Sequence, residues 1–370
     1  MGSEPVSLPT RFPTFGGCGP TRCSLTGVAG LFDRLAGLEV EVDHLAFERL
    51  EFETVRWVRV STVVAISGGG ETGRGEDVSY ATPDQDAHQR MDLPRLSGRR
   101  TLAEWSAALD QINLFPVPPS VPEARDYRRW AYESALLDLA LRQDGLSFAT
   151  ALGREARPVR FCASPTGDPH GLLDRYPDLE LKIDASVDWT ADDMARLAAT
   201  GRVRVVDLKG HYSGDWNRLP DDPAAFAAAV VQAFPDAVIE DPMLGPAMAP
   251  LIAANAQRMS FDAPVHSLAD LLLLPETGWC NIKPSRFATT ARLLECIDHC
   301  ERAGIRMYGG GQFELGPGWR QIQAIAAALY PEGPNDVAPG GYNAAHPGDD
   351  LASSPLVLGA AVGLDGDVGR

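Results

Sequence analysis

The sequence feature that most constrains the fold is a short apolar run ending in a charged residue, which recurs along the chain. Three such runs read VIEDPM, MSFDAP and CNIKPS, and their charged residues are Glu240, Asp262 and Lys283. The two intervals are nearly equal, and each leaves room for one strand, one helix and two short loops. Because the carboxyl ends of consecutive strands meet at one face of a parallel barrel, this repeat predicts a single shared site.

The same alternation of strand and helix continues on both sides of these runs. Strands are predicted at 159–164, 179–184, 203–210, 237–243, 259–264, 280–285, 305–311 and 337–343, with helical stretches such as PAAFAAAVVQAF and GWRQIQAIAAALY between them. Eight strands separated by helices favour a (β/α) barrel. The alternative is a doubly wound open sheet, which would usually carry a phosphate-binding loop after its first strand, and ASPTGDPHG is not such a loop.

The chain before the barrel follows a different pattern. LEVEVDHLAF and VRWVRVSTVVAIS read as strands, and GGGETGRGEDVSY at 68–80 as a mobile loop or hairpin end. TLAEWSAALDQI begins with a Thr-x-x-Glu capping box, and a long amphipathic helix follows and stops at Gly145. We therefore predict an irregular arm at 1–37, an α+β domain at 38–150, a barrel at 151–345 and a surface tail at 346–370.

The composition excludes some classes of partner and indicates the cellular compartment. A net charge of −17 argues against nucleic acid or an anionic membrane as a partner. No apolar run is long enough to span a bilayer, and the N-terminus lacks the pattern of a secretory signal. The six cysteines form no CxxC pair, which predicts reduced thiols and a cytoplasmic protein. Cys18 and Cys23 could supply two ligands of a small metal site, although nothing in the sequence supplies the rest.

Carboxylates end three consecutive predicted strands. They are Asp207, Glu240 and Asp262. Oxygen ligands of this kind suit Mg²⁺, whereas the absence of Cys and His from these strand ends disfavours zinc. A rival register would make LKIDAS the third strand and Asp184 the ligand, but the interval from Asp207 to Glu240 is closer to one repeat.

Lysines flank the three carboxylates. Lys182 and Lys283 would face each other across a closed barrel. Removing the proton α to a carboxylate creates a dianionic enediolate, which a divalent ion and nearby cations stabilise. A lysine with a lowered pKa could act as the base, and a second lysine could return the proton or hold the anion. Lys209 is a further candidate for the catalytic group, or it could form a structural salt bridge with Asp207 or Asp241.

Several motifs resemble those of the enolase superfamily, most closely the subgroup of muconate lactonising enzyme, o-succinylbenzoate synthase and the dipeptide epimerases. They are Glu240-Asp241-Pro242, Asp262, NIKPSR at 281–286, the Gly309–Gly311 turn and Glu314-Leu315-Gly316. The resemblance covers residues 38–345 and implies an α/β fold, a modified (β/α)7β barrel of the TIM type with an N-terminal α+β capping domain. GRGEDV at 73–78 resembles the end of the capping hairpin that closes over the substrate in that family.

The resemblance also implies a chemistry. Asp207, Glu240 and Asp262 would bind Mg²⁺, and Lys182 and Lys283 would be the acid/base pair acting on a small carboxylate substrate, in a chain that forms a homo-oligomer. This chain departs from the family where Asp-x-Asn is replaced by Asp207-Leu208-Lys209, Lys-x-Lys by Glu180-Leu181-Lys182, and Asp-Glu by Asp262-Ala263. These changes leave the shared proton abstraction plausible but give no named substrate.

Three functions therefore stay open on the sequence. The first is a racemase or epimerase that transfers a proton between two lysines. The second is a lyase, dehydratase or cycloisomerase of the same fold that uses one lysine, and the third is a small-molecule-binding barrel without catalysis.

Candidate substrate contacts are less specific. Arg286 could bind a substrate carboxylate or pair with an acidic neighbour, Gly310 could let the backbone approach the substrate, and Glu314 could reach the site from its loop. His266 could be catalytic or could cap a helix. Specificity is expected in the stretches 14–30, 68–80 and 339–343.

Overall fold

The computed structural model describes residues 30–54, 57–212, 218–342, 347–359 and 361–364. Most of the predicted arm at 1–37 lies outside these residues, and Cys18 and Cys23 lie outside them altogether. Within the described ranges, no helix combines the length and the apolar composition that a membrane span needs.

Antiparallel strands and helices form the N-terminal part. In the described residues, β1 (Glu39–Val42) pairs with β5 (Gly98–Thr101), and a second sheet has the order β2 (His44–Glu53), β3 (Val58–Gly68), β4 (Glu71–Asp77). The helices are α1 (Thr82–Arg90), α2 (Leu102–Leu109), α3 (Ala124–Gln143) and α4 (Phe148–Ala151). The predicted capping box at the start of α2 is confirmed, since Thr101 and Glu104 cap each other's backbone N–H groups.

The prediction of a mobile loop or hairpin end at 68–80 is correct for the hairpin turn and wrong for most of the stretch. Residues 71–77 form β4, and the turn before it consists of Gly69 and Gly70. Gly73 and Gly75 lie where β4 crosses α3, and a Cβ atom on Gly75 would stand 2.0 Å from the carbonyl oxygen of Ala131. These glycines therefore allow a sheet and a helix to pack closely, and they do not form a turn.

A curled parallel sheet forms the second part. Among the described residues its strands run in the order β6 (Cys162–Ala163), β7 (Glu180–Asp184), β8 (Val203–Asp207), β9 (Val238–Glu240), β10 (Met259–Phe261), β11 (Trp279–Ile282) and β12 (Arg306–Gly309). All neighbouring pairs are parallel. Each strand lies inside or beside one of the first seven predicted runs, so the strand and helix alternation is confirmed over this region.

The eighth predicted strand, at 337–343, is not formed in the part of it that the structure describes. Instead Asn335 pairs with Phe161 beside β6, and Asp336 N donates to Gly309 O on β12 at 2.8 Å. The Asn335 side chain also accepts from Gly309 N at 2.6 Å. Prolines lack the N–H that a strand needs, and Pro334 and Pro339 flank this segment, so the barrel closes through a bridge of one or two residues.

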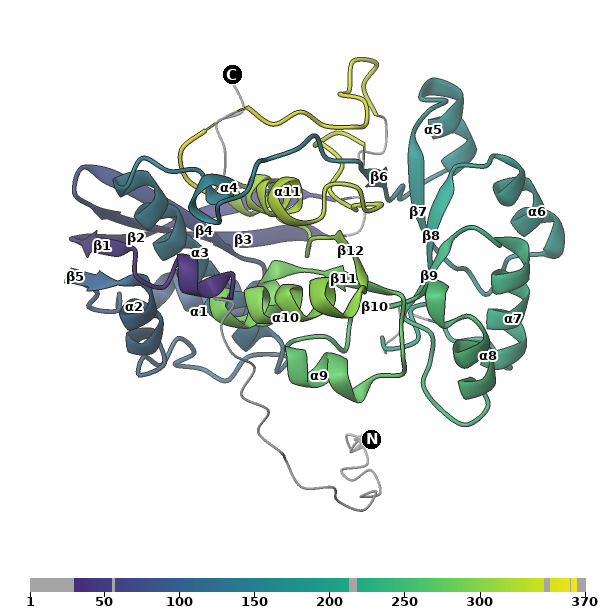
Figure 1. Cartoon of the computed structure of the whole chain (residues 1–370), viewed down its shortest axis with the longest axis horizontal. Helices are drawn as coiled ribbons and strands as arrows, with labels where there is room; N and C mark the ends of the chain where they lie inside the picture. Colours follow the sequence, from purple (N-terminus) through teal and green to yellow (C-terminus); the bar gives the residue numbers. More distant parts are fainter. Residues whose placement is uncertain (1–29, 55–56, 213–217, 343–346, 360, 365–370) are drawn as a thin grey trace.

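Helices follow the parallel strands and pack outside the sheet (Figure 1). They are α5 (Pro169–Arg175), α6 (Ala191–Ala199), α7 (Pro223–Ala233), α8 (Ala249–Ala254), α9 (Leu268–Leu273), α10 (Thr290–Ala303) and α11 (Pro317–Leu329), with the 3-10 helix η3 (Pro284–Phe287) after β11. Figure 1 shows the antiparallel strands at one end of the molecule and α5 to α8 at the other. The modified (β/α)7β barrel with an N-terminal α+β cap is thus confirmed.

The long helix α3 joins the two parts. It is buried along nearly its whole length, because β4 covers one side and η3 and α10 lie on another. The described residues of the C-terminal tail run back along this region, where Leu364 N donates to Asp138 of α3 at 2.7 Å and Leu356 pairs with Val159.

Candidate active site

The predicted charged residues meet at the carboxyl end of the parallel sheet. Asp207 ends β8, Glu240 ends β9, and Asp262 and Lys283 directly follow β10 and β11. Asp207, Glu240 and Asp262 are fully buried, while Lys182, within β7, and Lys283 are 3% and 8% exposed. The spacing of the sequence repeat therefore predicts these positions correctly.

Glu240 lies at the centre of the cluster. Lys182 Nζ donates to its two carboxylate oxygens at 2.5 and 2.7 Å and lies 3.7 Å from Asp207 Oδ2. Tyr308 Oη donates to Glu240 at 2.5 Å and Asn281 Nδ2 at 3.2 Å. Burial raises the pKa of Glu240 to about 7, even though Lys182 opposes this shift.

Lys182 responds to the same charges in the opposite sense. Burial lowers its pKa, but Glu240 and Asp207 outweigh burial and raise the pKa well above its ordinary value. A lysine that acts as the base is predicted to have a lowered pKa, so these carboxylates alone do not prepare Lys182 as a base.

Asp262 is held by a second group of cations. Lys283 Nζ lies 2.8 Å from Asp262 Oδ2, and Arg286 Nε lies 3.3 Å from Oδ1. Tyr212 Oη donates to Oδ2 at 3.1 Å. Burial raises the pKa of Asp262, but Arg286 and Lys283 outweigh it and hold this pKa well below its usual range. Of the two roles left open for Arg286, the structure therefore shows the ion pair with an acidic neighbour.

Lys209 binds the outer side of Asp207. Its Nζ lies 2.5 Å from Asp207 Oδ2 and 3.0 Å from Asp184 Oδ1. Burial raises the pKa of Asp207, but Lys209 and Lys182 lower it below its ordinary value. The side chain of Asp184 is 64% exposed and belongs to β7, so the rival register with Asp184 at the site is wrong.

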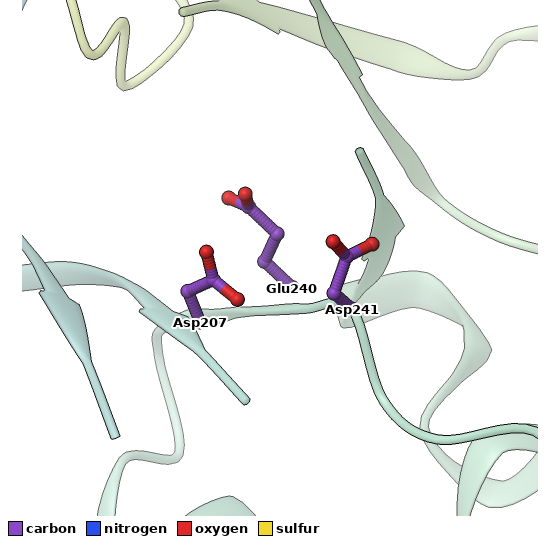
Figure 2. A group of neighbouring side chains, drawn as sticks. All are labelled: Asp207, Glu240 and Asp241. Carbon is purple, nitrogen blue, oxygen red and sulfur yellow. The ribbon is translucent and has the colours of Figure 1, made fainter. Parts of the chain in front are cut away.

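Asp241 is a buried carboxylate at the site that the sequence argument does not predict as a ligand. Ligand atoms of Asp207, Glu240 and Asp241 all lie within 4.8 Å of one another, and Figure 2 shows the three carboxylates on one side of the strand ends. Asp241 accepts from the backbone N–H groups of Asp262 and Ala263 at 2.8 and 3.0 Å. Burial, together with Asp262 and other carboxylates, raises its pKa well above its ordinary value.

Tyr212, Tyr308 and Asn281 also contact the carboxylates and are not predicted as site residues. The signal for Asn281 and Tyr308 is weak but present, because both lie near the ends of strands whose positions the sequence repeat predicts. Tyr212 lies in the loop after β8, where no periodicity indicates its direction.

The donor set fits a hard divalent cation. Every ligand atom offered by the cluster of Asp207, Glu240 and Asp241 is a carboxylate oxygen, which Mg²⁺ prefers, and the predicted ligand Asp262 is a buried carboxylate outside this cluster. In addition, Asn281 Oδ1 is buried and accepts no hydrogen bond from any described residue. A cation, a water molecule or a donor from a bound molecule would satisfy a buried acceptor of this kind beside Glu240.

The remaining predicted contacts differ in their proximity to the site. A Cβ atom on Gly310 would stand 3.0 Å from Lys283 Cε and 3.1 Å from Asn281 Oδ1, so a side chain there would crowd the lysine. Glu314 instead folds onto its own loop, where it accepts from Gln312 N at 2.8 Å. His266 Nδ1 lies 2.7 Å from Asp126 Oδ2 of α3.

The cap reaches the site through the loop after β12. Arg59 is fully buried, and its guanidinium donates to the carbonyl oxygens of Gln312 and Phe313 at 3.0 and 3.1 Å. With the Gln312 amide oriented so that its oxygen faces Arg286, its nitrogen donates to Tyr80 Oη at 3.1 Å and its oxygen accepts from Arg286 Nε at 2.8 Å. Of the predicted specificity stretch 68–80, the end at Tyr80 therefore approaches the site.

Four aromatic residues lie beside this contact, and we call them the aromatic rim: Phe52, Trp57, Tyr80 and Phe313. Trp57 lies 6.3 Å from Tyr80 and from Phe313 between ring centroids, and Phe52 lies 6.2 Å from Phe313. Phe52, Trp57 and Tyr80 are 40–50% exposed. Phe52 at the end of β2 and Trp57 just before β3 thus approach the site, and neither is among the residues predicted to do so.

Solved structures share this fold. A mandelate racemase/muconate lactonizing protein from Herpetosiphon aurantiacus has a TM-score of 0.66 at 18% identity, covering 90% of this chain and 99% of that one. A dipeptide epimerase from Enterococcus faecalis V583 has a TM-score of 0.66 at 16% identity, covering 88% and 99%. A dipeptide epimerase from Methylococcus capsulatus, complexed with Mg and the dipeptide L-Arg-D-Lys, has a TM-score of 0.61 at 19% identity, covering 79% and 88%.

These similarities show that the chain has the fold of muconate lactonizing and dipeptide epimerase proteins. The chain belongs to the family described as domain of unknown function DUF8230, whose N-terminal domain matches residues 33–151 and whose C-terminal domain matches residues 155–344. No curated protein matches the chain by sequence.

Proposed function

We propose that the protein is a Mg²⁺-dependent enzyme that removes the α-proton of a small carboxylate substrate and racemises or epimerises it. The observation that carries this proposal is the buried cluster of carboxylates that Lys182 and Lys283 contact. The Mg-bound dipeptide epimerase that shares the fold supports it. On the same resemblance we propose a cytoplasmic homo-oligomer.

Asp207, Glu240 and Asp262 are the proposed metal ligands. We propose a structural role for Asp241, whose two oxygens accept the backbone N–H groups of Asp262 and Ala263 and thereby fix the end of β10 beside the end of β9. When bound, the ion would stabilise the negative charge that develops on the substrate and would reduce the hold of Asp207 and Glu240 on Lys182.

The lysines lie on opposite sides of the carboxylates. Lys182 comes from β7 and contacts Glu240, whereas Lys283 follows β11 and contacts Asp262, with β8 to β10 between them. A substrate carbon held between the two Nζ atoms would meet one lysine on each face. The lysine that is a neutral amine would remove the α-proton and become an ammonium, and the other lysine, an ammonium at the start, would protonate the opposite face, which inverts the centre.

One observation favours a lyase or cycloisomerase as the second candidate. Lys182 donates to both oxygens of Glu240, and Lys283 is the more exposed lysine. If Lys182 keeps these bonds during turnover, it stabilises charge while Lys283 alone moves the proton. The reaction then ends with loss of a leaving group or with ring opening or closure, and not with protonation of the opposite face.

A proton-exchange screen separates these functions. Acid sugars, amino acids, dipeptides and N-acylamino acids are incubated with the protein in D₂O, with Mg²⁺ or with a chelator. An epimerase places deuterium in both antipodes, and a dehydratase gives a product lighter by one water. Failure of every class of substrate to exchange or react with Mg²⁺ present would contradict the proposed function.

A further inference from the structure

Lys209 has a backbone conformation that few residues of its type adopt. Its φ is +52°, in the left-handed region, where a non-glycine residue is strained. The residues on either side are fixed, since Leu208 N donates to Glu240 O at 2.9 Å and Gly210 N donates to Asp241 O at 2.8 Å. A Cβ atom on Gly210 would stand 2.3 Å from Met243 N. The end of β8 is thus clamped against the segment after β9.

This conformation directs two groups of Lys209 at one carboxylate. Its backbone N–H donates to Asp207 Oδ1 at 2.9 Å, and its ammonium donates to Asp207 Oδ2 at 2.5 Å. On its other side the ammonium lies 3.0 Å from Asp184, and the Lys209 side chain is 19% exposed. Asp207 is fully buried. The ammonium of Lys209, held in place by the strained backbone, neutralises its charge.

We infer that Lys209 is a built-in counter-ion of Asp207 that opposes the divalent cation and so sets the metal affinity of the site. The inference rests on the proposed function, because it takes Asp207 as a metal ligand. An ammonium and a divalent ion on one buried carboxylate repel each other, and burial weakens the screening by water and salt. Affinity in oxygen-ligand sites follows the charge of the surrounding groups. Lys209 is therefore a positioning and charge-balancing residue that does not transfer protons.

Calorimetric titration with Mg²⁺ tests the inference on four proteins: the native chain and the variants Lys209→Met, Lys209→Asn and Lys209→Arg. Methionine removes the charge without adding an oxygen ligand, and asparagine tolerates the left-handed backbone. Arginine keeps the charge and is the matched control. We expect the Mg²⁺ dissociation constant to fall about tenfold or more in the two neutral variants, and to stay near the native value in Lys209→Arg.

The outcomes separate the inference from the proposed function. Thermal unfolding without metal first establishes that each variant is folded. If the native chain binds Mg²⁺ and the folded neutral variants bind it equally or more weakly, the inference is wrong and the proposed function stands. If the neutral variants bind Mg²⁺ and the native chain does not, the inference holds and metal dependence of the native chain is wrong. If no folded protein binds Mg²⁺, both are wrong.

Discussion

Glu314 lies in the loop after β12 and was predicted to reach the site, yet its carboxylate folds onto its own loop. It is 9% exposed and accepts from Gln312 N, and burial raises its pKa to about 7. The folded state therefore holds the Glu314 proton more tightly than the unfolded state, in which the pKa is near 4.5. Its contribution to stability is complete below pH 4.5 and is lost as the pH rises through 7.

Replacing Glu314 should remove this pH dependence. In Glu314→Gln the amide oxygen can still accept from Gln312 N, but no charge is buried at high pH. We expect the free energy of unfolding of the variant to exceed that of the native chain by up to about 3 kcal/mol above pH 7, with the difference shrinking toward pH 4.5. Urea unfolding over this range measures it. Parallel pH profiles of the two proteins would show that Glu314 does not titrate as described.

Asp262→Asn tests the proposed metal ligand. The change removes a charge that faces Lys283 and Arg286 and a carboxylate oxygen that we assign to the ion. We expect calorimetric Mg²⁺ affinity to fall about tenfold or more. The matched control is Asp178→Asn, because the Asp178 side chain is 98% exposed in a surface ion pair with Arg202. Equal Mg²⁺ binding by Asp262→Asn and the native chain would count against Asp262 as a ligand.

The sequence predicts the main charged residues of the site, but not the other side chains that contact them. Asp207, Glu240, Asp262, Lys182 and Lys283 stand at positions that a regular repeat marks. Periodicity gives no such mark for Tyr212, which reaches Asp262 from a loop, or for Asp241, whose φ of +48° turns it out of the strand pattern. Strained backbone at a strand end is therefore where the sequence pattern fails.

Among the elements, the junction of β4 and α11 depends on one buried carboxylate. Glu76 of β4 accepts from the N–H groups of Leu315, Gly316 and Gly318 at 2.6, 2.9 and 3.1 Å. These groups belong to the N-terminus of α11, where the helix dipole also favours a negative charge. Glu76 thereby ties the cap to the barrel next to the loop that contains Gln312.

Neutralising this carboxylate should weaken the junction. We expect Glu76→Gln to lower the free energy of unfolding by about 1–3 kcal/mol, because a charged acceptor of several buried N–H groups is lost. Denaturant unfolding measures the change. The control is Glu71→Gln at the exposed start of the same strand, for which we expect no more than about 0.5 kcal/mol. Equal effects of the two substitutions would mean that Glu76 does not hold the two parts together.

The elements also show why the fold was predictable in part. The parallel strands are apolar runs at regular intervals, and the first seven were predictable for that reason. The closing segment at Asn335 has no such run, because its bonds to Gly309 come from one side chain and a few backbone groups. β4 was missed because Gly73 and Gly75 serve packing against α3, and the same residues are typical of turns.

Across the whole molecule, the site lies where the cap meets the carboxyl ends of the barrel strands. Arg59 and Glu76 come from the cap, and both bind the segment between β12 and α11. That segment leads through Gln312 to Arg286 and Asp262. We propose that substrates are chosen at the aromatic rim of Phe52, Trp57, Tyr80 and Phe313 and are transformed by residues of the barrel.

Lys182 and Lys283 are proposed to act on opposite faces of one substrate carbon. The most direct test is α-proton exchange in D₂O with Mg²⁺, followed separately for each antipode of a substrate found in the screen. We expect Lys182→Ala to abolish exchange from one antipode and Lys283→Ala to abolish exchange from the other, while the native chain exchanges both. Full-rate exchange of both antipodes by Lys283→Ala would contradict the claim.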